Sequence, residues 1–214
     1  MNALPAVAPS TAGGARPLTA GAPAAPAPWY LPGSADVVFL VVALIAAQGA
    51  KQTMLDDPGV GWHLRNIDAM LAQGGWLHTD PFSGPRGGQP WLCNQWLGEL
   101  PLWLGWRWAG LEGIAAVATI VIALTLRCLY RMLLRDGLPW PLAAFWTCLA
   151  ALGTSCSWSA RPNLFTMFFV LLTARACGSL HEGRLSRRAS LWLLPLFAVW
   201  ANTHGGFLAG FTLL

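Results

Sequence analysis

Long apolar runs, separated by short polar loops, are the feature that most limits the folds open to this 214-residue chain. The runs cover about 36–50, 113–129, 139–156, 163–177 and 191–200, and a last apolar stretch fills 205–214. An α-helix needs roughly 20 apolar residues to cross a bilayer, and most of these runs approach that length. Only 10% of the residues are charged, which is too few to cover the surface of a soluble domain. The pattern predicts an all-α membrane protein with five to six transmembrane helices.

The two ends of the chain differ from the rest. Residues 1–30 are rich in Ala, Pro and Gly with Arg16 as their single charge, so we expect a disordered tail ahead of a membrane domain at 31–214. The tail is too long and too proline-rich for a signal peptide, which predicts that the first span is retained. The sequence stops inside an apolar stretch, which either begins a sixth span or continues the fifth past a polar break. We therefore expect a C-terminal truncation.

Basic residues predict the orientation of the spans. They gather after the second and fourth apolar runs, at Arg127, Arg131, Arg135, Arg184, Arg187 and Arg188. By the positive-inside rule these loops are cytoplasmic, so the N-terminus is cytoplasmic and the long loop 51–112 lies outside. Because the basic residues are scattered in short loops, they do not indicate nucleic-acid binding.

The long loop 51–112 predicts two helices that lie at the membrane surface. At 62–73, Leu64 and Ile67 occupy one helical face while Arg65 and Asp68 occupy the other, and Gly74 ends the helix. Turns follow at 80–90, where Pro and Gly are frequent. A second helix at about 91–108 carries five tryptophans, which suit the headgroup layer.

Polar side chains gather in three segments that this orientation places on the external face. They are Asp56, Asp57, His63, Arg65, His78 and Asp80 in the long loop, Arg161 before the fourth run, and Asn202 and His204 after the fifth. Polar groups at membrane depth normally face a cavity or a helix partner. We therefore expect the three segments to form one site.

Five motifs occur in order between Leu55 and the C-terminus. They are DPGVGWHLR (57–65), DPFS (80–83), the Trp91, Gln95-Trp96-Leu97 and Glu99 group, ARP (160–162) and WANTHGGF (200–207). This set resembles a family of uncharacterised bacterial polytopic membrane proteins. That family in turn is similar to the GT-C class of membrane glycosyltransferases, which includes the protein mannosyltransferases and the aminoarabinose transferases of lipid A.

The resemblance implies a multi-pass protein of the bacterial inner membrane that uses a polyprenyl-phosphate sugar. GT-C enzymes place a catalytic acid early in the first external loop, which by position falls on Asp57 and Asp56. Two departures stand out. The class has eight or more spans, and a Glu that often precedes the Trp-Leu pair is replaced by Gln95, although Glu99 lies nearby.

Sugar transfer of this kind needs a base for the acceptor hydroxyl and donors for the departing phosphate. Asp57 is the predicted base and Asp56 the second candidate, because adjacent carboxylates can raise one pKa. The alternative is that both acids cap the following helix or solvate the end of the first span. His63 and His78 either bind a divalent cation with Asp57, contact phosphate, or serve structural roles.

The other candidates also have two interpretations. Arg65 and Arg161 can bind phosphate through the guanidinium fork, or can reach the headgroups of bulk lipid. Asp80 either contacts substrate or forms a turn with Pro81. Asn202 and His204 either line the external cavity or bond to a neighbouring helix.

The function predicted from the sequence is transfer of a sugar from a polyprenyl-phosphate donor at the outer face of the inner membrane. The partners are then membrane lipid and the polyprenyl-phosphate sugar, and a divalent cation is the one cofactor that the residues suggest. The alternative is a non-catalytic polytopic protein, either a lipid-linked glycan carrier or an assembly subunit, or an inactive fragment. The sequence specifies neither the sugar, the acceptor nor the oligomeric state.

Overall fold

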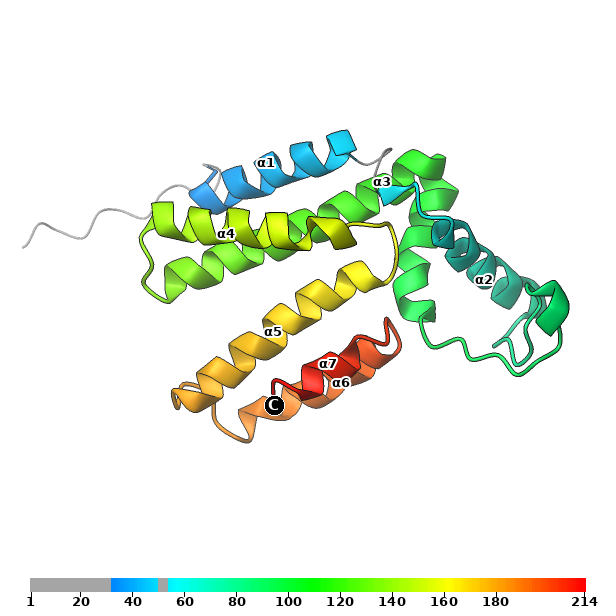
Figure 1. Ribbon diagram of the computed structural model, residues 1–214. Coiled ribbons are helices and arrows are strands. Elements are labelled where there is room, and N and C mark those ends of the chain that lie inside the picture. The colour runs from blue at the N-terminus through cyan, green and yellow to red at the C-terminus, as the bar shows by residue number, and fades with distance from the viewer. Residues whose placement is uncertain (1–31, 50–53) are drawn as a thin grey trace, which may run out of the picture. The chain divides into compact units, whose positions relative to one another are not determined.

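The computed structural model describes residues 32–49 and 54–214, and all regular elements in this part of the chain are helices (Figure 1). They are α1 (Ser34–Gly49), α2 (Gly59–Gln73), η2 (Gly84–Arg86), α3 (Trp96–Arg135), α4 (Trp140–Thr154), η3 (Ser155–Ser157), α5 (Asn163–His181), η4 (Ala189–Trp192), α6 (Leu193–Ala201) and α7 (Phe207–Phe211). One isolated bridge pairs Thr79 with Pro90. The all-α prediction is therefore confirmed for the described residues, and the predicted tail 1–30 lies outside them.

Two helices, α3 and α5, are long and apolar enough to cross a membrane. Helix α1 and the segment 189–201 are apolar but shorter. The predicted apolar runs thus correspond to helices, but two helices of spanning length are found where the sequence predicts five to six.

Helix α3 changes direction sharply within its length. Its backbone leaves helical geometry at Ala109 and at Gly110, whose φ of 60° and ψ of −140° favour glycine. A Cβ atom on Gly113 would lie 1.9 Å from the carbonyl oxygen of Gly105, so the two parts of α3 touch through glycines. The bend joins the predicted second surface helix to the second apolar run. This helix begins at Trp96, so the prediction that it starts at 91 is wrong for residues 91–95.

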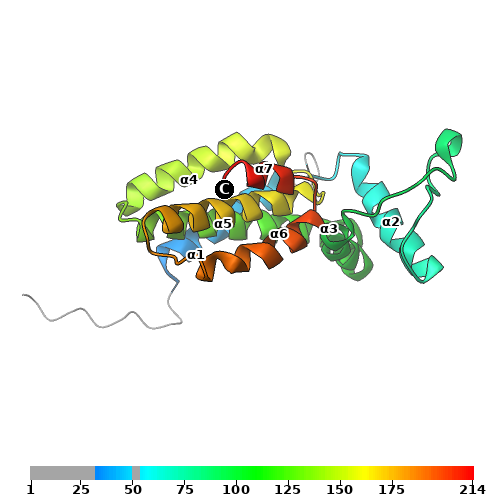
Figure 2. The ribbon, with the colours of Figure 1, turned by 90° about the horizontal axis from the view of Figure 1, so that it is seen from below.

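The long part of α3 is the centre of the packing. Helices α1, α2, α4 and α5 all contact α3, and Figure 2 shows α4, α5 and α1 running along it. Ile114, Ala118 and Ile122 are fully buried at four-residue spacing, which is the spacing of one helical face. An ion pair of 2.5 Å from Arg127 to Asp36 fixes the start of α1 to the same helix.

The apolar C-terminal stretch forms a separate short helix. Residues 202–206 turn the chain after α6, and α7 then runs back beside it (Figure 1). A Cβ atom on Gly210 would lie 2.5 Å from Trp200, so the two helices are in close contact. Of the two alternatives for 205–214, continuation of the preceding helix is therefore excluded.

Candidate functional site

Asp57 and Arg161 form an ion pair between two segments that are distant in sequence. A guanidinium nitrogen of Arg161 donates to Oδ2 of Asp57 at 2.9 Å. Oδ1 accepts from the backbone N–H of Gly59, the first residue of α2, at 2.8 Å. The Gly59 N–H and then Arg161 lower the pKa of Asp57. Asp57 therefore makes the contact expected of a helix-capping acid and in addition binds a cation.

The Arg161 segment is attached to the residues before α2 by its backbone. The N–H of Ala160 donates to the carbonyl oxygen of Met54 at 2.9 Å, and both residues are buried. Gly59 leaves room for the guanidinium, since a Cβ atom there would lie 3.3 Å from Cζ of Arg161. Backbone hydrogen bonds therefore position both partners: the Gly59 N–H bonds to Asp57, and the Ala160–Met54 bond fixes the segment that carries Arg161.

The segment 202–204 joins this assembly through the start of α3. The N–H of Leu97 donates to the carbonyl oxygen of Asn202, and the indole of Trp96 donates to its side-chain oxygen, both at 3.1 Å. Gly98 permits the contact, because a Cβ atom there would lie 2.6 Å from the carbonyl oxygen of Thr203 and 2.8 Å from Pro162. The three polar segments therefore converge, as the sequence predicts.

His204 is held by two hydrogen bonds to one ring nitrogen. Nδ1 lies 3.0 Å from the backbone N–H of Gly206 and 3.0 Å from the hydroxyl of Thr166, which accepts from Trp200. A backbone N–H can only donate, so Nδ1 accepts and neutral His204 carries its proton on Nε2. Burial, and then the positive charge of Arg161 and a smaller electrostatic effect of His63, lower the pKa of His204. His204 therefore sits as a neutral donor near Arg161.

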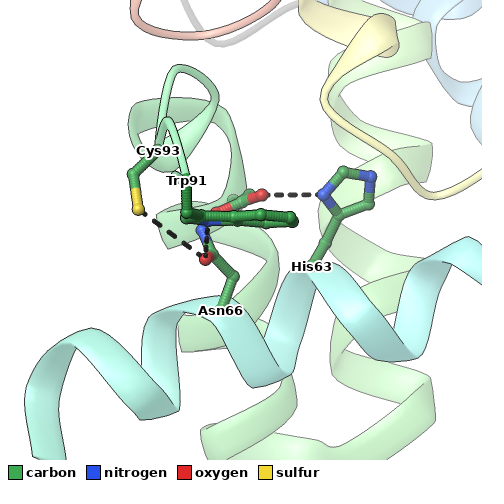
Figure 3. A network of polar contacts seen from close by, with 5 residues as sticks. His63, Asn66, Trp91 and Cys93 are labelled. Carbon is green, nitrogen blue, oxygen red and sulfur yellow. Dashed lines mark hydrogen bonds and ion pairs between the residues drawn. The ribbon is translucent and has the colours of Figure 1, made fainter. Parts of the chain in front are cut away.

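A buried polar network lies between α2 and α3 (Figure 3). Nδ1 of His63 is 2.8 Å from Oε1 of Glu99, and the amide of Asn66 donates to Oε2 at 2.5 Å. The indole N–H of Trp91 donates to the amide oxygen of Asn66 at 3.4 Å, with Cys93 Sγ 3.8 Å from the same oxygen. His63, Asn66 and Glu99 are all at most 4% exposed. The network thus satisfies both oxygens of a carboxylate removed from water.

Aromatic rings cover one side of this network. Trp62 stacks on His63 with ring centroids 4.9 Å apart and also meets Trp91 at 5.2 Å and Phe82 at 6.0 Å. Asp80 holds Phe82 in place, because its Oδ1 accepts from the N–H groups of Phe82 and Ser83. The Ser83 side chain, then the Phe82 N–H and to a lesser degree the Ser83 N–H lower the pKa of Asp80. The turn interpretation of Asp80 is therefore confirmed.

Three predicted residues do not join the site through their side chains. Asp56 is exposed, and Arg65 is exposed with a 3.9 Å contact to Asp68. His78 is exposed and supplies only its carbonyl oxygen, to the N–H of Trp91. No three His, Cys, Asp or Glu side chains within 32–49 and 54–214 are grouped to hold a metal ion. The predicted cation site of Asp57, His63 and His78 is therefore not formed.

Asn66 and Thr166, which bond to Glu99 and His204, are not among the residues predicted from the sequence. Asn66 follows His63 by three residues, so both fall on the same face of an amphipathic helix as Leu64 and Ile67. A polar side chain on a buried face needs a partner, and this was the available signal for Asn66. Thr166 gives no such signal, because threonine is common in apolar helices.

An apolar groove formed by α3, α4 and α5 reaches the site at Thr166. Its volume is about 340 Å³, and Leu129, Ala150, Met167 and Val170 are among its lining residues. Trp158 and Thr166 also line it, and Thr166 bonds to His204. The groove thus connects an apolar surface to the polar cluster.

Comparison of the chain with protein families, with curated proteins and with solved structures finds no match. The resemblance to the GT-C class stays a prediction from the sequence motifs.

Proposed function

We propose that this protein is a polytopic membrane glycosyltransferase of the GT-C type, which transfers a sugar from a polyprenyl-phosphate donor at the outer face of the inner membrane. The observation that carries the proposal is the Asp57–Arg161 ion pair, which sets a phosphate-binding cation beside a carboxylate. An apolar groove reaches the same polar cluster through Thr166, which lines the groove and bonds to His204. A lipid-linked phosphate needs this combination, because its charged head and its apolar chain bind to different surfaces.

Exposed apolar side chains support a membrane location. Leu44 and Ile45 of α1 are more than 60% exposed, and Leu152 of α4 is 73% exposed. Apolar surface of this extent marks a face that lipid or protein covers. The spanning length of α3 and α5 and the apolar character of α1 and α6 agree with a polytopic arrangement.

Arg161 is the residue proposed to hold the donor phosphate. Its side chain is 44% exposed and has one carboxylate partner, so the rest of the guanidinium is open to a second anion. The Nε2–H of His204 supplies a neutral donor in the same region. The polyprenyl chain would then occupy the groove formed by α3, α4 and α5, with Trp158 and Thr166 at its head.

In the proposed reaction, the acceptor oxygen bonds to the anomeric carbon while the bond from that carbon to the phosphate oxygen breaks. The electron pair leaves with the polyprenyl phosphate, whose growing negative charge Arg161 stabilises. The acceptor hydroxyl loses its proton to a base.

The test is transfer of label from polyprenyl phosphates carrying different radiolabelled hexoses, in membranes that contain wild type, Arg161→Gln or Asp57→Asn at equal expression. We expect wild type to transfer label from one donor and both variants to lose transfer. Arg187→Gln is the control, because Arg187 is exposed and outside the site. No transfer from any donor by folded wild type would favour the non-catalytic carrier or assembly subunit.

A further inference from the structure

The buried His63–Glu99 pair is costly for a fold to keep. Both side chains are at most 5% exposed, and they lie 2.8 Å apart. Taking a carboxylate out of water costs several kcal/mol, and an apolar pair of similar size often gives equal or greater stability. A pair of this kind therefore calls for a role beyond holding α2 against α3.

The direction of the hydrogen bonds in the network can be assigned from its ends. The indole N–H of Trp91 can only donate, so the amide oxygen of Asn66 faces Trp91 and the amide nitrogen faces Glu99. An ionised Glu99 only accepts, so Nδ1 of His63 donates to Oε1. Neutral His63 then has an unprotonated Nε2, which is free to accept a proton.

Nε2 of His63 is the ring nitrogen that does not bond to Glu99, and it is not fully buried. Figure 3 shows this nitrogen pointing away from the bond to Glu99. Among the described residues, the fully buried side-chain oxygens and nitrogens without a partner are Thr119 Oγ1 and Asn163 Oδ1, and Nε2 is not one of them. Gly59, which faces the Arg161 guanidinium, precedes His63 by four residues, so both residues lie on one face of α2. A group bound at Arg161 therefore lies at the same face of α2 as His63.

Asp57 is less able than His63 to accept a proton from the acceptor hydroxyl. One of its oxygens accepts from the Gly59 N–H and the other from Arg161. Both bonds stabilise the charged form, which makes the carboxylate a good partner for a cation and a weak acceptor for a proton.

We propose that His63 is the base that takes the proton from the acceptor hydroxyl, and that Glu99 is a positioning residue that holds the proton of His63 on Nδ1. This inference rests on the proposed glycosyl transfer. As the acceptor oxygen bonds to the anomeric carbon, its proton passes to Nε2 and the phosphate leaves with the bonding pair. The imidazolium, stabilised by Glu99, then returns the proton to water.

The first test is His63→Asn, because the asparagine amide nitrogen occupies about the position of Nδ1 and can still donate to Glu99. Nε2 is lost, so we expect kcat to fall by roughly 10²–10⁴-fold, the usual contribution of a general base. The KM for the labelled hexosyl polyprenyl phosphate should change less than about threefold. His181→Asn, at the exposed end of α5, should match wild type.

The second test is Glu99→Gln. The glutamine amide can donate to Nδ1, which moves the proton of neutral His63 to Nε2 and removes its ability to accept. We expect a loss of kcat with an unchanged melting temperature, and recovery in Glu99→Asp.

The outcomes separate the two proposals. Transfer by wild type and by folded His63→Asn at equal kcat would overturn the role of His63 and leave glycosyl transfer intact. Loss of kcat in Asp57→Asn alone would assign the base to Asp57. No transfer by folded wild type from any hexosyl donor would overturn both.

Discussion

Arg161 lies 104 residues after Asp57 in the chain, and a 2.9 Å hydrogen bond joins its guanidinium to Oδ2 of that carboxylate. The bond fixes the segment before α5 to the segment before α2. It also gives each residue a defined direction, since Asp57 is held on its other side by the Gly59 N–H. In the proposed function, an arginine fixed in this way would bind the donor phosphate in one position, which a mobile arginine cannot do.

The first prediction is that this pair matters little for stability. The side chains are 44% and 27% exposed, so solvent screens their attraction. A double-mutant cycle with Asp57→Asn and Arg161→Gln should give a coupling free energy of about 0.2–1 kcal/mol. Thermal unfolding in detergent measures it. A coupling of several kcal/mol would show that the pair is a structural element of the fold.

The second prediction concerns the stability that Asp57 contributes at low pH. The pKa of Asp57 lies below its ordinary value of 3.8 because the Gly59 N–H and Arg161 stabilise the charged form. A lowered folded-state pKa contributes stability that is complete above the unfolded value and lost as pH falls through the folded value. The difference in melting temperature between wild type and Asp57→Asn should therefore be constant above about pH 5 and shrink below pH 3.8. A difference that does not change down to pH 2 would contradict the assignment.

The third prediction concerns Gly98, where three segments meet. A methyl group there would lie 2.6 Å from the Thr203 carbonyl oxygen, a backbone atom that cannot move alone. Gly98→Ala should therefore lower the free energy of unfolding by about 1–3 kcal/mol. The matched control is Gly61→Ala in α2, where nothing lies within 4 Å and alanine should be neutral or stabilising. Equal melting temperatures for the two variants would contradict the close packing at Gly98.

The sequence predicts the helices of this fold better than the contacts between them. Apolar runs locate the helices because burial requires them, and Gly74 ends α2 with a φ of 71°, as expected of a helix-terminating glycine. The bend of α3 at Ala109 and Gly110 falls in the gap between the predicted helix at 91–108 and the apolar run at 113–129, but residue types alone do not specify its angle. His63 and Glu99 are both candidates from sequence, but their contact depends on how α2 meets α3, which residue types alone do not specify.

The bend of α3 gives the fourth prediction. Gly110 has a φ of 60° and a ψ of −140°, a region that residues with a Cβ atom rarely enter. Gly110→Ala should cost about 1–3 kcal/mol, either by strain or by straightening the helix and separating Gly105 from Gly113. Gly153→Ala in α4 is the control, since no atom lies within 4 Å of its added methyl group. Melting temperatures of the two variants in detergent measure the difference, and equal values would contradict the strained geometry of Gly110.

The last prediction tests the charge of the buried network through Asn66. The side chain donates to Oε2 of Glu99 at 2.5 Å and accepts from the half-buried Trp91, so Asn66→Ala removes a partner from the buried Glu99 carboxylate and from the Trp91 indole. That loss should cost about 1–3 kcal/mol. Asn66→Asp keeps the shape but sets a second carboxyl group against the Glu99 carboxylate. One of the two carboxyl groups must then stay protonated, with a folded-state pKa above its unfolded value.

A raised pKa contributes stability that is complete below the unfolded value and lost as pH rises through the folded value. The penalty of Asn66→Asp should therefore be small at about pH 4 and increase toward neutral pH, while that of Asn66→Ala shows no such increase. Melting temperatures of the two variants across this range measure the difference. A penalty for Asn66→Asp that does not depend on pH would mean that Glu99 is already protonated, and His63 would then lack the negative charge that stabilises it as an imidazolium.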